Sequence, residues 1–301
     1  MGIVLGANEY GKAETRVVRV TRARTQHQIW DLNVSTSLRG DFTDAHVTGD
    51  QSHILPTDTQ KNTAYAYAKT GACTDIEDYA LELATHFVDD VAPVEGARVE
   101  VDEYAWDRVD VAGRPHPHAF VRRGQEIRTT VVTVESGHSG RHVWVVSGLK
   151  ELVLLKSTGS QFRGFLTDPY TTLPETDDRV MATSLTARWR YASTDVNWST
   201  AHAGIRSVLL ATFADVHSLA LQHTLWEMGL AALTAHPEVA EMRLSAPNRH
   251  HFTVDLTPFQ LDNPNEVFHA DDRPYGLIQV TVGRDDAPDA GAAWHTVTAA
   301  T

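Results

Sequence analysis

The sequence predicts an α+β protein with antiparallel sheets, because one order of elements occurs twice along the chain. In each half, alternation of apolar and polar residues marks strands, and apolar residues at helical spacing mark a pair of helices. The order is a strand pair, a helix pair and a further strand pair, which is typical of α+β folds. We therefore expect two tandem domains, at residues 1–145 and 146–301.

The first half begins with strands and continues through two helices to three longer extended segments. The expected ranges are 16–22, 28–38, 57–69, a helix from 74 onward, 97–111, 118–135 and 141–156. The pattern is clearest in 28–38, where Trp30, Leu32 and Val34 share one face. Thr74-x-x-Glu77 has the spacing of a capping box at the start of the second helix. We expect a bulge in the sheet near Glu103, where the apolar phase shifts.

The apolar stripe of the second helix and the short connection between the first two strands are also predicted. The stripe comprises Ile76, Ala80, Leu83 and Phe87 at helical spacing. Thr25-Gln26-His27 between the strands suggests a hairpin. Together these features place a helix pair against an antiparallel sheet.

The second half is expected to repeat this plan and to end in a flexible tail. Its expected elements are a strand at 180–191, helices at 198–216 and 219–235, and strands at 239–244, 250–256 and 276–282. Pro247 has no N–H for a ladder, so we expect the strand that precedes it to end near Ser245. Asn248 and His250 would then lie at a break, where side chains can face a ligand. The residues after the last strand, 283–301, are rich in Ala, Asp and Gly.

Composition and charge exclude several classes of function. A chain of 301 residues with 42% hydrophobic residues can bury a core. The net charge of -13 argues against a nucleic-acid surface, whereas an anionic small molecule fits if a local Arg or Lys reverses the field. We expect no membrane span and no signal peptide. Cys73 is the single cysteine, which fits a reducing cytoplasm.

Several segments, taken together, resemble the urate oxidase (uricase) family. In chain order they are Asn8–Lys12, Thr57–Thr63, Leu155–Phe162, Asp178-Arg179 with Ala187–Tyr191, and Pro247–His250. The last of these, Pro-Asn-Arg-His, resembles the Pro-Asn-Lys-His signature of the family. The resemblance runs from about Gly6 to Val282 in the order of the family and with its approximate spacing.

This resemblance implies a fold, an assembly and a reaction. The fold would be two tandem tunnelling-fold (T-fold) domains, whose sheets join those of other subunits into a closed barrel in a homotetramer. The reaction would be the oxidation of urate by O2 to 5-hydroxyisourate with release of H2O2, a step of purine degradation that needs no cofactor. The sequence ends Ala299-Ala300-Thr301 rather than in the peroxisomal Ser-Lys-Leu, so a bacterial cytoplasmic enzyme is expected.

The same resemblance assigns Lys12, Thr57 and His250 to a proton relay. A histidine titrates near neutral pH and can pass a proton onward. Taken alone, Lys12 reads as a surface charge and Thr57 as a helix cap. The backbone N–H groups beside Asp58 at the start of a helix can also receive an anion.

A second group of residues is expected, by resemblance, to hold a flat purine anion. Phe162 would stack on the ring, Arg179 would offer a planar fork, and Gln222 would pair its amide with the opposite edge. Leu221 would contribute a backbone N–H, and Asn248 would hold O2 and later water together with the relay threonine. In the family, the two groups of residues meet across a subunit interface, so an isolated monomer would have no complete site.

Two other functions stay open at this point. A zinc-dependent T-fold enzyme acting on a pterin or purine would need ligands such as His116 and His118, His138 to His142, or His250 with His251. A non-catalytic purine-binding oligomer would keep the fold without turnover. The sequence shows no Gly-rich dinucleotide loop after a predicted strand and no clear His/carboxylate ligand set.

Overall fold

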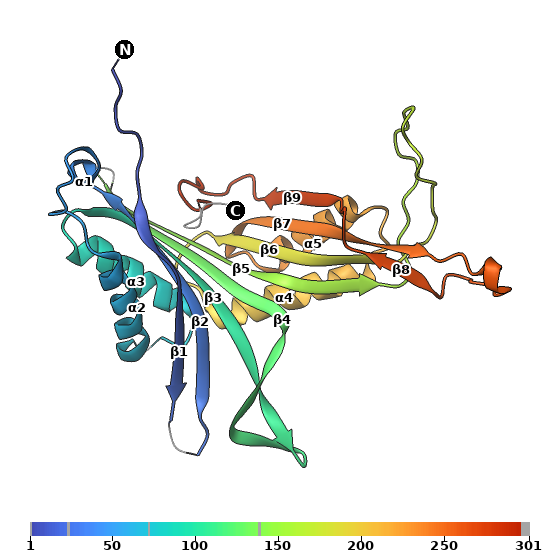
Figure 1. Cartoon of the computed structure of the whole chain (residues 1–301), viewed down its shortest axis with the longest axis horizontal. Coiled ribbons are helices and arrows are strands. Elements are labelled where there is room, and N and C mark those ends of the chain that lie inside the picture. Colours follow the sequence, from blue (N-terminus) through green and yellow to red (C-terminus); the bar gives the residue numbers. More distant parts are fainter. Residues whose placement is uncertain (1, 23–24, 72, 138–139, 296–301) are drawn as a thin grey trace. The chain divides into compact units, whose positions relative to one another are not determined.

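The structure is a computed structural model that describes residues 2–22, 25–71, 73–137 and 140–295 (Figure 1). The predicted α+β class with antiparallel strands is confirmed. Contacts divide the chain into two compact units that are each discontinuous in sequence. Unit 1 comprises Met1–Gly148, Arg190–Ser199 and Pro288–Thr301, and unit 2 comprises Leu149–Trp189 and Thr200–Ala287. The division at 145/146 into tandem T-fold domains stays a prediction.

Unit 1 is a sheet covered on one face by helices. Its strands neighbour one another in chain order, and the pairs from β1 to β4 are antiparallel. The predicted hairpin between the first two strands is present, since Thr21 pairs with Gln28. The strands are β1 (Tyr10–Thr21), β2 (Gln28–Gly40), β3 (Val94–Val111), β4 (Arg114–Gly137) and β5 (Gly140–Lys156), which passes into unit 2 after Gly148.

The helices of unit 1 are α1 (Thr43–Val47), α2 (Thr57–Thr70) and α3 (Ile76–Asp90). Figure 1 shows α2 and α3 side by side along the sheet, and α3 contacts both β3 and β4. The predicted stripe of α3 is confirmed, because all four of its residues, Ile76, Ala80, Leu83 and Phe87, are fully buried. The register of β3 and β4 shifts between Tyr104 and Trp106, next to the predicted bulge.

The predicted capping box at the start of α3 is wrong. The N-cap residue is Asp75, and no side chain there makes a capping hydrogen bond. Glu77 turns into the core instead, where its carboxylate accepts from Ser147 Oγ (2.6 Å) and Arg128 Nη2 (2.6 Å). A buried partner far along the chain therefore replaces the local hydrogen bond that the spacing suggested.

Unit 2 repeats the combination of a sheet with a pair of helices. Its strands follow the order β5, β6, β7 and β8, and β9 also pairs with β7. Its elements are β6 (Met181–Tyr191), α4 (Trp198–Asp215), α5 (Leu221–Ala235), β7 (Val239–Thr253), the 3-10 helix η1 (Thr257–Phe259), β8 (Phe268–Asp271) and β9 (Leu277–Gly283). Gly229 allows α5 to approach β9, since a Cβ there would lie 2.5 Å from Val282 Cγ2. Within the described ranges, no helix of either unit is long and apolar enough to cross a membrane.

The strand break expected at Pro247 is wrong, because β7 runs without interruption from Val239 to Thr253. What changes there is the neighbouring strand. Residues up to Pro247 pair with β9, and residues from His250 onward pair with β8. The proline, which has no N–H to donate, stands at the end of the first pairing. Asn248 and His250 therefore lie within a strand.

Part of the C-terminal segment packs into unit 1, in contrast to the expected flexible tail. Ala293 is 2% exposed and forms a small core with Val131 and Val146, against which Trp144 and Trp294 pack. Arg190 Nη2 donates to the carbonyl oxygen of Pro288 (2.8 Å). Residues 296–301 lie outside the described residues.

Candidate active site

A cavity of about 380 Å³ in unit 2 brings together four of the predicted site residues. Phe162 and Arg179 come from the segment between β5 and β6, which Figure 1 shows as a long connection, and Asn248 and His250 come from β7. Residues that are distant in the chain thus line one cavity.

The segment that carries Phe162 and Arg179 is held by the carboxylate of Asp178. This carboxylate accepts from Thr158 Oγ1 (2.6 Å) and from the backbone N–H groups of Gly159 (2.8 Å) and Ser160 (3.3 Å). The hydrogen bond from Thr158, with those from the backbone, lowers the pKa of Asp178. Through these hydrogen bonds Asp178, which directly precedes Arg179, fixes the turn that precedes Phe162.

Arg179 is a partly buried cation with an unpaired Nε donor. Its Cζ lies 5.2 Å from the centroid of the Phe162 ring, a cation–π distance. Its Nε is buried without a hydrogen-bond partner, and in the described part of the chain no carboxylate pairs with it. Burial lowers the pKa of Arg179, although a guanidinium keeps its charge at neutral pH. Because an unpaired buried donor is unfavourable, this arrangement fits a ligand that supplies acceptor atoms.

The β7 side of the cavity carries Asn248 and His250 two residues apart, and hence on one face of the strand. The Asn248 N–H donates to the carbonyl oxygen of Gly276 (2.8 Å), which fixes the strand at that position. The His250 ring stacks on Phe252 with centroids 5.6 Å apart and an interplanar angle of 18°. Both side chains therefore reach the cavity from a fixed backbone.

Leu221 and Gln222 open helix α5 and do not line this cavity. Their helix is nevertheless connected to it, because Ser218 exchanges backbone hydrogen bonds with the turn before Phe162, accepting from the Gln161 N–H (2.8 Å) and donating to the Gly159 carbonyl (2.9 Å). Leu221 is 2% exposed. Its N–H belongs to the first helical turn, where backbone donors have no acceptor within the helix.

The remaining predicted residues, Lys12, Thr57 and Asp58, lie together in unit 1. Thr57 and Asp58 form the first turn of α2, and Lys12 lies on β1. The pKa of Asp58 is lowered mainly by Lys61, with a further contribution from the charge of Lys12. Thr57 is not the helix cap, because Pro56 occupies the N-cap position without a side-chain hydrogen bond.

The backbone around Lys12 depends on the glycine before it. A Cβ on Gly11 would lie 1.7 Å from the carbonyl oxygen of Thr36, so only glycine permits this approach of β1 to β2. The Lys12 N–H donates to Thr36 Oγ1 (3.4 Å), and that hydroxyl donates to buried Gln60 Oε1 on α2 (2.8 Å). These contacts set the position of Lys12 relative to the first turn of α2.

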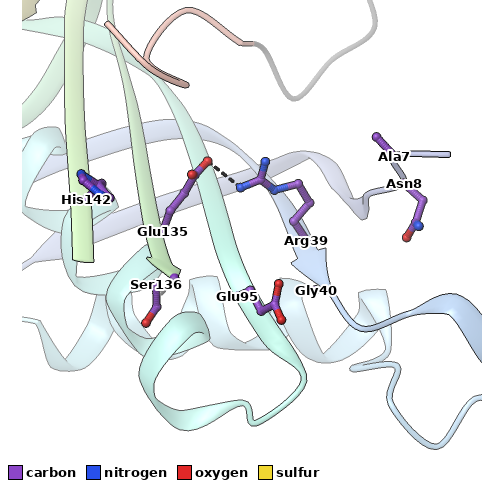
Figure 2. A pocket seen from close by; sticks show the side chains of 9 residues that line it. Ala7, Asn8, Arg39, Gly40, Glu95, Glu135, Ser136 and His142 are labelled. Carbon is purple, nitrogen blue, oxygen red and sulfur yellow. Dashed lines mark hydrogen bonds and ion pairs between the residues drawn. The ribbon is translucent and has the colours of Figure 1, made fainter. Parts of the chain in front are cut away.

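Unit 1 contains another cavity, of about 440 Å³, which is a poorer candidate for an anion (Figure 2). Figure 2 shows the Arg39 guanidinium directed at Glu135, and the two groups pair at 2.5 Å. Glu95 adds a second carboxylate to the lining. Among the described residues that line this cavity, the single arginine thus already has its counter-charge, unlike Arg179.

A comparison of the sequence with protein families decides the classification. The model of the family named Uricase matches residues 8–133 and 145–279. The chain belongs to the uricase family. This confirms the resemblance that the sequence motifs indicated, and the enzyme is a urate oxidase, an oxidoreductase.

Uricases from other organisms are similar to the chain over nearly its whole length. The uricase of Arthrobacter globiformis is 48% identical over 98% of this chain and 95% of that protein. Uricase from Dictyostelium discoideum is 36% identical over 92% of this chain and 96% of that protein. The crystal structure of the Arthrobacter globiformis uricase superposes with a TM-score of 0.92, covering 98% of this chain and 99% of that one.

The cavity in unit 2 is also lined by residues to which the sequence motifs assigned no role. Asp178 and Thr176 line it from the β5–β6 segment, and Phe268 lines it from β8. Asp178 directly precedes Arg179 in one of the family motifs, so the sequence could have indicated that it lies near the cavity. Phe268 belongs to a strand of four residues that no alternation predicted.

The histidines considered as zinc ligands occur as pairs. The rings of His116 and His118 lie 4.5 Å apart, edge to face. His138 lies outside the described residues. Among the residues that are described, no three His, Cys, Asp or Glu side chains are grouped so that they could hold a metal ion.

Proposed function

We propose that the cavity in unit 2 binds urate, and that the enzyme oxidises it with O2 to 5-hydroxyisourate and H2O2 without a prosthetic group. The observation that carries this proposal is Arg179, a partly buried guanidinium with an unpaired Nε beside an aromatic ring. Urate is flat and anionic and has adjacent oxygen and nitrogen acceptors, so it matches both groups.

The chemistry needs positioning and proton transfer from the protein. One urate, one O2 and one water give one 5-hydroxyisourate and one H2O2. Urate loses two electrons, which O2 accepts together with two protons, and water adds a hydroxyl group to the oxidised ring. Deprotonated urate is electron-rich enough to give the first electron directly to O2, which overcomes the spin restriction. The protein then orients the reactants and moves protons.

Each substrate-binding residue has a role suited to its place. Phe162 stacks on the purine plane, and the Arg179 fork donates to one edge of it. The Gln222 amide and the Leu221 N–H, both in the first turn of α5, donate to the opposite edge. Asn248 holds O2 and then water above the ring.

Lys12, Thr57 and His250 relay protons between urate, O2 and water in this proposal, and Asp58 contributes to the binding of substrate. The first turn of α2 supports this role, because its free backbone N–H groups and the nearby Lys12 favour an anion. We further propose a homotetramer, in which Lys12 and Thr57 of one copy meet His250 of another.

A urate assay on purified enzyme, with chelator present and the mass of the assembly measured, tests this function. We expect O2 consumption, loss of urate absorbance and peroxide release in equal amounts. Lys12→Ala and Thr57→Ala should each lower turnover by about 100-fold or more, as removal of a proton-transfer group does, without changing the assembly mass. Lys69→Ala, at the exposed end of α2, is the control. Loss of activity with chelator would favour the zinc enzyme, and binding without turnover would favour the inert oligomer.

A further inference from the structure

Phe162, the proposed stacking residue, is itself in contact with a second aromatic ring. The ring of Phe165 stacks on it with centroids 4.9 Å apart and an interplanar angle of 17°. Phe162 and Arg179 line the cavity, whereas Phe165 does not. Phe165 therefore lies behind the stacking residue rather than in the space that the purine would occupy.

The chain between the two rings is shaped to bring them together. Gly164 has a φ of 69°, a left-handed conformation that favours glycine, and the turn at this residue folds Phe165 back onto Phe162. The Gly164 N–H donates to Glu175 Oε1 (2.7 Å), and Arg163 forms an ion pair with Asp177.

The backbone of Phe162 is also fixed on its other side. Its N–H and C=O exchange hydrogen bonds with Thr176, at 2.9 and 3.0 Å. The backbone is therefore held by hydrogen bonds at Phe162 and Gly164, while the Phe162 side chain is only partly buried. The ring itself contacts Phe165 and the Arg179 guanidinium, and both contacts oppose its rotation about χ1 and χ2.

We propose that Phe165 is a positioning residue, which holds the Phe162 ring so that one face is presented to the purine. This inference rests on the proposed stacking role of Phe162. A stack of this geometry contributes a free energy equivalent to about a two- to tenfold change in an equilibrium constant. Because the ring would stack on substrate and transition state alike, its displacement should raise KM and leave kcat nearly unchanged.

The test compares variants that keep or remove the aromatic face of Phe165. Phe165→Leu should raise the KM for urate about three- to tenfold, with kcat within twofold of wild type. The inhibition constant of xanthine, a flat purine that lacks the 8-oxo group, should rise by a similar factor. Phe165→Tyr keeps the ring and should stay within twofold of wild type in both quantities. The control is Leu166→Ala, at the neighbouring exposed residue, which should change neither.

A double-mutant cycle separates positioning from general packing. In a Phe162→Leu background no ring is left to position, so Phe165→Leu should have no further effect on KM. The inference fails if the effect of Phe165→Leu is the same in both backgrounds, or if Phe165→Tyr is as impaired as Phe165→Leu. If Phe162→Leu alone leaves KM unchanged, the stacking role under the proposed function fails instead. If Phe165→Leu does not fold, Phe165→Tyr is compared with Leu166→Ala and with wild type. A KM of Phe165→Tyr more than twofold above that of wild type then overturns the inference.

Discussion

Two arginines of this chain differ in whether carboxylates pair with them. Arg128 is 16% exposed and lies near the carboxylates of Glu77 (2.6 Å), Asp75 (3.2 Å) and Glu103 (3.7 Å). Arg179 has no such partner in the described part of the chain, and its Nε is buried. The Nε of Arg128 is also buried without a hydrogen-bond partner, so the two arginines differ in their carboxylate partners. Removal of one partner from a buried ion pair destabilises a fold, whereas a buried charge without a partner is unfavourable for folding and is available to a ligand.

Replacing Arg179 should therefore separate activity from stability. We expect Arg179→Gln to lower kcat/KM for urate by about 100-fold or more, because it removes a charge-assisted, forked contact. The free energy of unfolding should be unchanged or higher, since an unpaired cation is removed. Arg179→Lys should give an intermediate kcat/KM, because it keeps the charge without the planar fork.

Arg128→Gln is the matched comparison. It leaves buried carboxylates without their cation, so its unfolding free energy should fall by about 3 to 5 kcal/mol. Steady-state urate kinetics and urea unfolding of both variants make the measurement. An Arg179→Gln enzyme with kcat/KM within twofold of wild type would show that Arg179 is not a substrate ligand.

At the scale of elements, helix α3 begins with a carboxylate in the core. Glu77 is fully buried, and it accepts from Ser147 on β5 and Arg128 on β4. It thereby connects the start of the helix to two neighbouring strands. Burial raises the pKa of Glu77, and the opposing effects of Arg128 and Ser147 do not cancel this.

The raised pKa of Glu77 predicts a definite pH dependence of stability. The folded state holds the Glu77 proton more tightly than the unfolded state, where the pKa is about 4.3. The contribution of this group to stability is therefore fully present below about pH 4.3 and is lost as the pH rises through the folded-state pKa. In Glu77→Gln this loss should be absent.

Urea unfolding at a series of pH values tests this prediction. The unfolding free energy of wild type minus that of Glu77→Gln should decrease as the pH rises from about 4 and then level off. Glu95→Gln, at an exposed residue of β3, should follow the wild-type pH dependence. A difference that increases with pH would contradict the assignment of the raised pKa to burial.

At the scale of the whole molecule, the proposed site draws on both compact units. Lys12, Thr57 and Asp58 belong to unit 1, and Arg179, Asn248 and His250 belong to unit 2. In the proposed homotetramer, each site takes the first group from one copy and the second group from another. A closed symmetric assembly would repeat this arrangement at each site.

Mixing two inactive variants tests whether sites are shared between copies. Lys12→Ala and Arg179→Gln should each be nearly inactive alone. If they are unfolded and refolded together in equal amounts, about a quarter of the sites in randomly mixed tetramers should combine Lys12 and Arg179, and activity should return to about that fraction of wild type. Mixing the folded proteins without exchange of subunits is the control. Recovery no greater than in that control would show that both residues act within one chain.

Much of the fold follows from short-range patterns in the sequence. Buried residues recur every three or four positions in a helix and every second position in a strand. The apolar stripe of α3 therefore predicts a helix, and the alternation in β2 predicts a strand. The same local patterns failed at Glu77 and Pro247. In each case a partner from a distant part of the chain, a core arginine or a change of neighbouring strand, determined the outcome.

The sequence by itself determined the class of the fold, the family and the identity of the proposed site residues, because motifs and periodicity are properties of neighbouring residues. Only the tertiary structure decided which of these residues share a cavity, that no carboxylate among the described residues pairs with Arg179, and that Phe165 stacks on Phe162. These facts depend on the directions of side chains and on the exclusion of water by distant segments. Neither the direction of a side chain nor the exclusion of water from it can be inferred from the spacing of residues along the chain.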